Sequence, residues 1–302
     1  MKFNLDKIAS HQGEIAIVTG ANTGLGKEIT IGLVQKDIQV IMACRNLTKA
    51  EAAKAEILKA VPTANIELMK LDLTSLKSVR DFASAFKQKY HHLNLLIENA
   101  GIMIPEYFKT EDGFESQMGV NYFSHFLLTN LLFPLLNNTK GARIATTGSI
   151  AHESGTINFN DINWEKNYAK MPAYRQSKLA CLMFAYELQR KIDKSESNVI
   201  AVSAHPGVSK TNLFNNLPLF IQLISTPFIP LLTHPPKQAA LPMLYAALGE
   251  DIKGGDYLGP IGYKGMKGVP GKVKAKPHAY DIAIAEKLWL VSEELTKEKF
   301  TL

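Results

Sequence analysis

An apolar run that ends in a glycine-rich turn limits the fold of this chain more than any other feature. Residues 14–19 (EIAIVT) are typical of a strand buried on both faces of a parallel sheet. The turn Gly20-Ala-Asn-Thr-Gly24-Leu-Gly26 follows, and a helical pattern continues to about Lys36. Glycines allow a backbone to approach a pyrophosphate, and the free N–H groups of a helix N-terminus attract its charge. The stretch therefore predicts a dinucleotide-binding turn, although a plain tight turn between strand and helix has the same pattern.

Strand-like and helix-like stretches alternate through most of the chain. Further strands are predicted at 39–43, 65–70, 93–97, 143–147, 199–204 and 254–258. Helices are predicted at 47–61, 75–90, 114–137, 172–192, 236–248 and 278–295. This alternation predicts an α/β fold: a single-domain, Rossmann-type, doubly wound parallel sheet of about seven strands, flanked by helices on both faces. No linker or shift in composition divides residues 1–302, which we expect to form one domain.

The ends of the predicted strands carry residues suited to a nucleotide. Cys44-Arg45-Asn46 follows the second strand without an acidic residue. An acid there would bind the ribose 2′-hydroxyl of NAD, whereas an arginine accommodates the 2′-phosphate of NADP. We therefore predict NADP(H), with a plain surface arginine as the alternative. Asp72 ends the third strand, where it could meet an adenine amine or cap the next helix.

Other notable residues follow the remaining strands, namely Asn99, Ser149 and Pro206-Gly207. Ligands of open parallel sheets bind outside the carboxyl ends of the strands. Residues scattered at random would not gather at these positions, so the pattern favours an enzyme.

Tyr174 and Lys178 lie one turn apart on a predicted helix, so their side chains share a face. A lysine cation beside a phenol lowers the phenol's pKa from about 10, which suits the tyrosine to proton transfer. Tyr263 and Lys267 have the same spacing, but glycines around them make a stable helix unfavourable. Such a pair on its own is more often part of an exposed helix face. The catalytic interpretation therefore depends on the other motifs in the chain.

Composition argues against several functional classes. A net charge of +6, dispersed along the chain, is too mild to indicate a nucleic-acid partner. Two cysteines imply no disulfide framework, which fits a cytoplasmic protein. The eight histidines show no metal-ligand spacing, so no metal is expected. The longest apolar run, 217–232, is interrupted by prolines and does not predict a membrane span.

Two segments stand outside the alternating pattern. Residues 208–236 are apolar and proline-rich, and we expect them to form a substrate lid. Residues 264–276 contain five lysines, and we expect a solvated loop.

Taken together, the motifs resemble the short-chain dehydrogenase/reductase family over nearly the whole chain. The matching residues are Thr19-Gly20-x-x-x-Gly24-x-Gly26, Asp72, Asn99-Ala100-Gly101, Asn121, Ser149, Tyr174-x-x-x-Lys178 and Pro206-Gly207-x-x-x-Thr211. The exact residues of four segments are similar to those of the retinol-dehydrogenase and WW-domain-oxidoreductase-like branch. These segments are Gly20 to Lys27, Ala43-Cys-Arg45, His125-Phe-Leu-Leu-Thr129 and Ser149-Ile-Ala-His152.

The resemblance implies a role for each matching residue. Tyr174 would exchange a proton with the substrate oxygen, and Lys178 would hold the nicotinamide ribose and lower the Tyr174 pKa. Ser149 would hydrogen-bond the substrate oxygen, and Asn121 would support a proton relay. NADP(H) would contact Gly20, Asn22, Thr23, Gly24, Leu25, Gly26, Arg45, Asn46, Asp72, Leu73, Asn99, Ala100, Gly101, Tyr174, Lys178, Pro206, Gly207, Val208 and Thr211.

Two positions depart from the family's usual pattern. Glu98 stands where the family often has asparagine, and Gly148 precedes Ser149 where a serine is usual. A carboxylate at position 98 would either perturb the site or point away from it.

The predicted function is that of an NADP-dependent oxidoreductase that transfers hydride between NADP(H) and an alcohol or carbonyl. The apolar residues 213–232 favour a lipophilic substrate, although core packing or a subunit surface would have the same composition. The resemblance is compatible with a homodimer or homotetramer. The main alternative is a dinucleotide-binding regulator that keeps the fold without turnover. An epimerase or dehydratase ranks lower, because little chain follows Thr211 to form a sugar-binding domain.

Overall fold

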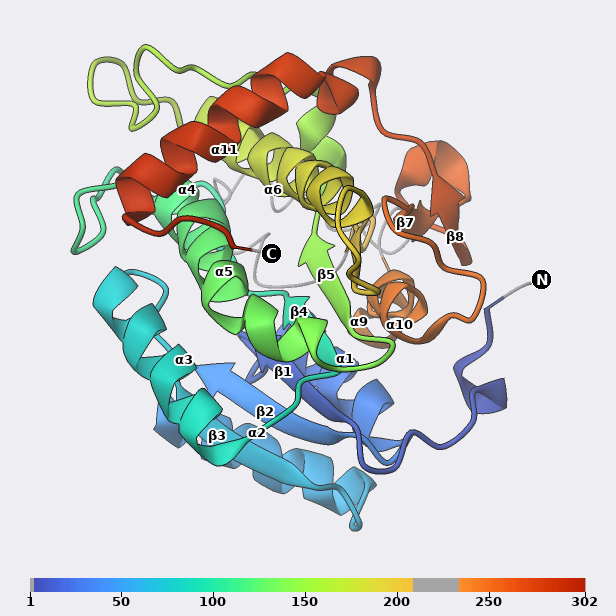
Figure 1. Ribbon diagram of the computed structural model, residues 1–302. Helices are drawn as coiled ribbons and strands as arrows, with labels where there is room; N and C mark the ends of the chain where they lie inside the picture. Colours follow the sequence, from blue (N-terminus) through green and yellow to red (C-terminus); the bar gives the residue numbers. More distant parts are fainter. Residues whose placement is uncertain (1–2, 209–233, 302) are drawn as a thin grey trace.

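The computed structural model describes residues 3–208 and 234–301, which fold around one sheet. Its strands are β1 (Ile15–Thr19), β2 (Gln39–Cys44), β3 (Ile66–Lys70), β4 (Leu95–Glu98), β5 (Arg143–Thr147), β6 (Ile200–Ala204), β7 (Tyr257–Pro260) and β8 (Pro270–Val273). They are arranged in the order β3-β2-β1-β4-β5-β6-β7-β8. All neighbours are parallel except β7 and β8 (Figure 1). The predicted doubly wound sheet is therefore confirmed.

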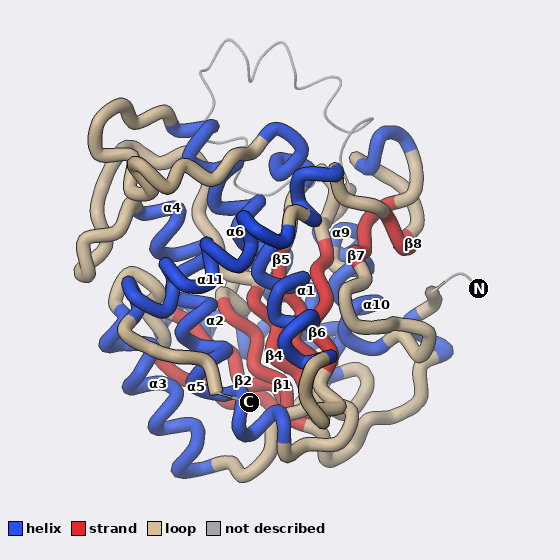
Figure 2. The backbone as a smooth tube through the Cα atoms, turned by 45° about the horizontal axis from the view of Figure 1, so that its top comes forward, coloured by secondary structure: helices blue, strands red, loops and turns tan. Residues whose placement is uncertain are grey.

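Helices cover both faces of the sheet. They are α1 (Gly24–Val34), α2 (Leu47–Ala60), α3 (Leu76–Lys89), α4 (Ser116–Met118), α5 (Ser124–Asn137), α6 (Lys170–Asp193), α9 (Pro236–Ala239), α10 (Leu241–Leu248) and α11 (Ile282–Thr296). Buried side chains of α3, α5, α6 and α11 share one core, whereas those of α1, α2 and α10 share a second. Figure 2 shows the strands in red between helices on either side. Strands β1 and β4 are buried along their whole length, as their apolar runs predict.

Capping side chains mark where several helices begin. Asn46, Ser75 and Asp281 each accept a hydrogen bond from a backbone N–H in the first turn of α2, α3 and α11. Such caps satisfy N–H groups that have no partner inside the helix. In α2 and α3, which follow the parallel strands β2 and β3, the caps place the helix starts within a few residues of the carboxyl edge of the sheet.

Three elements differ from the predictions. Strand β8 lies in the lysine-rich stretch that was predicted to be a solvated loop, and it pairs antiparallel with β7 at the sheet edge. Proline and lysine suit an edge strand, because they discourage further pairing, but they hide the usual strand pattern. Residues 236–248 form two helices, α9 and α10, rather than one. The predicted helix from residue 114 includes the π-helix η2 (Gly119–Phe123) between α4 and α5.

The other predicted features concern the lid and the second Tyr–Lys pair. Most of the predicted lid, residues 209–233, lies outside the described residues. Around Tyr263 the chain forms only a short 3-10 turn, η5 (Tyr263–Gly265), with Lys264 in the left-handed region at φ 46°. This agrees with the expectation that Tyr263 and Lys267 do not share a stable helix face.

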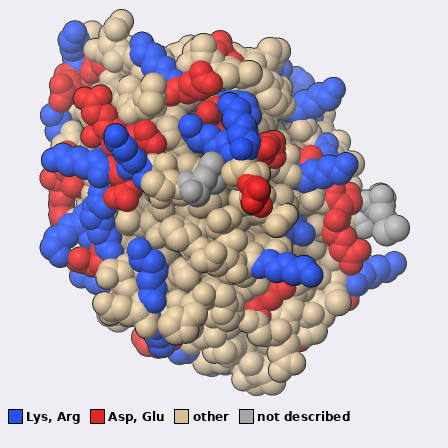
Figure 3. Space-filling model, in the orientation of Figure 1, with Lys and Arg blue, Asp and Glu red and all other residues tan. Residues whose placement is uncertain are grey.

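Two features of the described part bear on possible partners. None of its helices is long and apolar enough to cross a membrane, and no group of three metal-ligating side chains occurs in it. Lysine and arginine alternate with aspartate and glutamate on the face seen in Figure 3, without a continuous basic surface there.

Candidate active site

The glycine turn joins β1 to α1 with little room for side chains. Gly20 and Gly24 have φ values of +65° and +51°, a region that L side chains rarely adopt. A Cβ atom at Gly26 would overlap the carbonyl oxygen of Gly20 and lie 2.6 Å from Asn99 Nδ2. The turn therefore keeps backbone exposed at the N-terminus of α1, where free N–H groups favour an anion.

Thr19 connects this turn to the loop after β4. Its hydroxyl oxygen accepts hydrogen bonds from the backbone N–H groups of Asn99 and Ala100, both at 2.9 Å. Asn99 Nδ2 in turn donates to the carbonyl oxygen of Thr19 at 2.9 Å. Asn99 Oδ1 is buried and has no partner among the described residues. A buried acceptor beside a glycine cradle fits a dinucleotide that supplies a donor there.

Asn121 lies in the π-helix η2, and its side chain bridges two other parts of the site. Its Oδ1 accepts from the backbone N–H of Ile102 at 2.8 Å. Its Nδ2 donates to Ile102 O at 3.0 Å and to Ser177 Oγ on α6 at 2.9 Å. Single-turn π-helices within α-helices occur often at functional sites, because they displace one residue from the regular spacing.

His125 and Cys181 lie behind Asn121. The Asn121 carbonyl oxygen accepts from Cys181 Sγ at 3.1 Å and lies 3.0 Å from His125 Nδ1. His125 Nε2 lies 3.0 Å from Thr19 Oγ1. Burial lowers the pKa of His125 to about 4, so the ring is neutral near pH 7. A polar chain therefore runs from β1 through His125 to the π-helix.

Helix α6 carries Tyr174 and Lys178 toward the same edge of the sheet. Lys178 is buried, and its Nζ donates to the carbonyl oxygen of Thr147, at the end of β5, at 3.0 Å. A Cβ atom at Gly101 would lie 3.1 Å from Asn121 Oδ1 and 3.6 Å from Lys178 Nζ. Tyr174 is half-buried, one turn before Lys178. The structure thus brings Gly101, Asn121 and Lys178 together beside the end of β5.

Ser149 follows β5 by two residues and begins the 3-10 helix η3 (Ile150–Ser154). Its Oγ accepts a hydrogen bond from the backbone N–H of Ala151 at 3.1 Å. Because the hydroxyl oxygen acts as an acceptor there, its own proton stays available for another acceptor.

Of the residues predicted to bind the adenosine part of the cofactor, some are exposed and others make hydrogen bonds within their own segment. Arg45 is exposed directly after β2. The Asn46 side chain caps α2 through Lys49 N at 2.9 Å, and Asp72 Oδ1 accepts from both the N–H and the hydroxyl of Thr74. Asp72 therefore does not cap α3, whose N-cap is Ser75, and one of its oxygens is used in a local turn before that helix.

The last predicted cofactor segment follows β6. Gly207 has φ +71°, and its N–H donates to His205 Nδ1 at 3.3 Å. Val208 N donates to the carbonyl oxygen of Met266, in the loop between β7 and β8, at 2.9 Å. Thr211 lies outside the described residues.

Glu98, the departure from the family pattern, lies in the core under α5. It is 3% exposed, and Thr129 Oγ1 of α5 donates to its Oε1 at 2.6 Å. Burial raises the pKa of Glu98 to about 8, so the carboxyl is largely protonated near pH 7. Glu98 pairs in register with Thr146 on β5, whose buried hydroxyl has no partner among the described residues.

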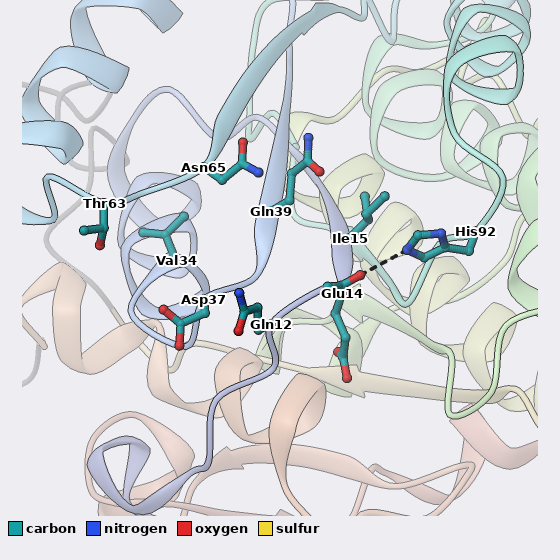
Figure 4. Close-up of a pocket in the computed structure, with 10 residues that line it drawn as sticks. Gln12, Glu14, Ile15, Val34, Asp37, Gln39, Thr63, Asn65 and His92 are labelled. Atoms are coloured by element: carbon teal, nitrogen blue, oxygen red, sulfur yellow. Dashed lines mark hydrogen bonds between the residues drawn. The ribbon is translucent and has the colours of Figure 1, made fainter.

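A cavity of about 550 Å³ opens at the opposite end of the sheet (Figure 4). It is lined by residues at the amino ends of β1 and β2, including Glu14, Asp37 and Gln39, with His92 beside them. None of the predicted site residues lines it. The cavity is therefore separate from the site described above.

Sequence reasoning missed several residues of the site. Thr19, Ser177 and His152 hold it together through hydrogen bonds, yet they were not among the predicted functional residues. Thr19 and His152 occur within the recognised motifs, which is the only signal the sequence offers. The contact of Ser177 with Asn121 depends on the packing of α6 against the π-helix.

Comparisons with known proteins agree with this geometry. The model of the short chain dehydrogenase family matches residues 14–220. Human retinol dehydrogenase 13 is 39% identical over 292 residues, covering 95% of this chain and 86% of that relative. A crystal structure of an uncharacterised protein from Mycobacterium paratuberculosis has a TM-score of 0.84 and 38% identity, with full coverage of both chains. The Pseudomonas aeruginosa RhlG/NADP active-site complex, at 24% identity and a TM-score of 0.64, shares the fold over 82% of this chain and 94% of that one.

Proposed function

The chain belongs to the short-chain dehydrogenase family of oxidoreductases, and from this membership we propose that it transfers hydride between NADP(H) and an alcohol or carbonyl group, with Tyr174 as general acid/base. One observation carries the proposal. Asn121 and Lys178 converge on the loop after β4, and Lys178 is tied to the end of β5 just before Ser149. These contacts support a site at the carboxyl edge, where ligands of such sheets bind, and Tyr174 would reach it from one turn before Lys178 on α6.

Each side chain has a task that its surroundings support. Tyr174 would give its proton to a carbonyl oxygen during reduction, or take one from an alcohol during oxidation. The buried Lys178 ammonium would hold the nicotinamide ribose. Ser149 would donate its free hydroxyl proton to the same substrate oxygen and stabilise the negative charge that develops there. The bound nicotinamide would supply the hydride chemistry.

The proposed cofactor contacts follow from the shape of the glycine turn between β1 and α1. The glycine turn and the N-terminus of α1 would hold the pyrophosphate, and the unpartnered Asn99 Oδ1 would accept a hydrogen bond. Support for NADP(H) over NAD(H) comes from exposed Arg45 and the absence of an acidic residue at 44–46.

Arg45→Asp is expected to reverse the cofactor preference. Losing a charge-assisted contact of about 1.5–3 kcal/mol would lower kcat/KM for NADPH by roughly 10–100-fold, while NADH improves. Initial rates with both cofactors measure this ratio. Lys59→Glu, the same reversal of charge at the far end of α2, serves as the control and should leave the ratio unchanged. An equal preference in wild type and Arg45→Asp would remove Arg45 from the cofactor site.

We further propose a lipophilic substrate. The name of the similar human protein, retinol dehydrogenase 13, and the apolar residues 213–232 support this. The test is NADPH consumption against aldehydes and ketones of increasing chain length and ring size, with NADH as the control. Faster turnover of short polar carbonyls would contradict the lipophilic preference. Tight NADPH binding without turnover on any carbonyl would favour the regulator instead.

A further inference from the structure

The His152 ring is held at both of its nitrogens. It is 2% exposed, in η3, three residues after Ser149. Nε2 lies 3.3 Å from the backbone N–H of Lys276, which can only donate, so Nε2 is the acceptor. The ring proton then lies on Nδ1, which donates to the Ser149 carbonyl oxygen at 2.6 Å. Burial also lowers the pKa of His152, which favours this neutral form.

The C-terminal segment also contacts the backbone of His152 and the side chain of Glu153. His278 Nε2 lies 2.9 Å from the carbonyl oxygen of His152, and Lys276 Nζ lies 3.7 Å from Glu153. The His152 ring also meets Tyr257 of β7 edge-on, with ring centroids 5.6 Å apart. A rotation of the imidazole would therefore break contacts to two distant parts of the chain.

His152 makes two hydrogen bonds to the backbone of Ser149. Its carbonyl oxygen accepts from the His152 backbone N–H at 3.1 Å as well as from Nδ1. Only the Ser149 hydroxyl is held separately, by Ala151 N. Two hydrogen bonds to the carbonyl fix the peptide plane after Ser149 and so hold the backbone that carries the hydroxyl.

We propose that His152 is a positioning residue that aims Ser149 at the substrate oxygen and links it to residues 276–280. The inference rests on the proposed function, because it takes Ser149 as the residue that contacts the substrate. His152 itself does not touch the reacting atoms in this role. It acts by holding the backbone of Ser149, and a misplaced catalytic group lowers the rate of the chemical step more than binding.

Two substitutions separate the two contacts. His152→Asn keeps an N–H donor at the δ position, which can still reach Ser149 O, but it lacks the Nε2 acceptor. His152→Gln keeps an acceptor near the ε position for Lys276 N but loses the δ donor. For both variants, kcat and KM are measured with NADPH and a carbonyl, together with amide hydrogen exchange over 150–155 and 276–280. The control is His92→Gln, which replaces an exposed histidine whose Nε2 lies 3.1 Å from the carbonyl oxygen of Gly13.

We expect the two variants to differ in both kcat and amide hydrogen exchange. His152→Gln should lower kcat about 10-fold with little change in the KM for NADPH, and exchange over 150–155 should rise. His152→Asn should keep kcat near wild type, with faster exchange only over 276–280. Equal losses of kcat and equal rises in exchange in both variants would mean a purely structural role and overturn the proposal. A split in exchange without a split in kcat would overturn it as well.

The exchange measurement also separates this inference from the proposed function. If wild type reduced no carbonyl with either cofactor, the proposed function would fail. The difference in amide hydrogen exchange between His152→Asn and His152→Gln would then decide alone whether His152 holds the Ser149 backbone.

Discussion

Tyr174→Phe is expected to lower kcat by about 10²–10⁴-fold while NADPH still binds, because the substitution removes only the hydroxyl that we propose exchanges the proton. The aromatic ring remains, so the packing of α6 should not change. The Tyr174 backbone carbonyl, which accepts from Ser177 Oγ at 2.8 Å, is also retained. Steady-state rates with a saturating carbonyl and NADPH titration by fluorescence measure the two quantities.

The chain offers a matched control for this substitution. Tyr263 also has a lysine four residues later, but it is 63% exposed and lies in a short 3-10 turn. Tyr263→Phe should leave kcat unchanged. Turnover in Tyr174→Phe equal to wild type would assign the proton transfer to another group, and loss of NADPH binding would point to a damaged fold.

Glu98→Gln is expected to stabilise the protein, and by more at pH 8 than at pH 5.5. Burial raises the pKa of Glu98 to about 8, whereas an unfolded glutamate titrates at about 4.3. Between these values the folded protein holds a proton that the unfolded chain has released. Stability is therefore lost as pH rises through this window. At about 1.4 kcal/mol per pKa unit, the loss reaches on the order of 5 kcal/mol above pH 8.

Glutamine removes this titration and keeps the local contacts. Its oxygen can still accept from Thr129 Oγ1, and its amide can donate to the unpartnered Thr146 hydroxyl, which is in register on β5. The measurement is urea unfolding of both proteins at pH 5.5 and pH 8. Glu51→Gln, at an exposed position on α2, is the control. A destabilisation of Glu98→Gln that is the same at both pH values would contradict this account.

Much of the fold follows from apolar patterns in the chain. Strands β1, β4 and β5 are short apolar or half-apolar runs, and the structure has them within about two residues of the predicted bounds. Strand β8 was missed because an edge strand needs few apolar residues. The π-helix was missed because one extra residue in a buried helix hardly changes its pattern, although it decides which way Asn121 points.

The candidate site was predictable only in part. Tyr174, Lys178 and Asn121 belong to motifs, and the structure places Lys178 and Asn121 beside the same loop. The contacts of His152 could not be predicted, because they join turns whose conformation has no sequence period. The sequence singled out Glu98, but only its burial and its hydrogen bond with Thr129 show that it faces the core under α5.

The hydrogen bonds that assemble the site join distant parts of the chain. Thr19 and Ala100 are 81 residues apart, and Asn121 and Ser177 are 56 apart. Loops of this length must close before these bonds form, and non-local contacts of this kind slow folding. An early collapsed state could hold every helix of the protein and still have no site. Because a dinucleotide can bind only the finished sheet, its binding would draw the folding equilibrium toward the complete structure rather than toward intermediates.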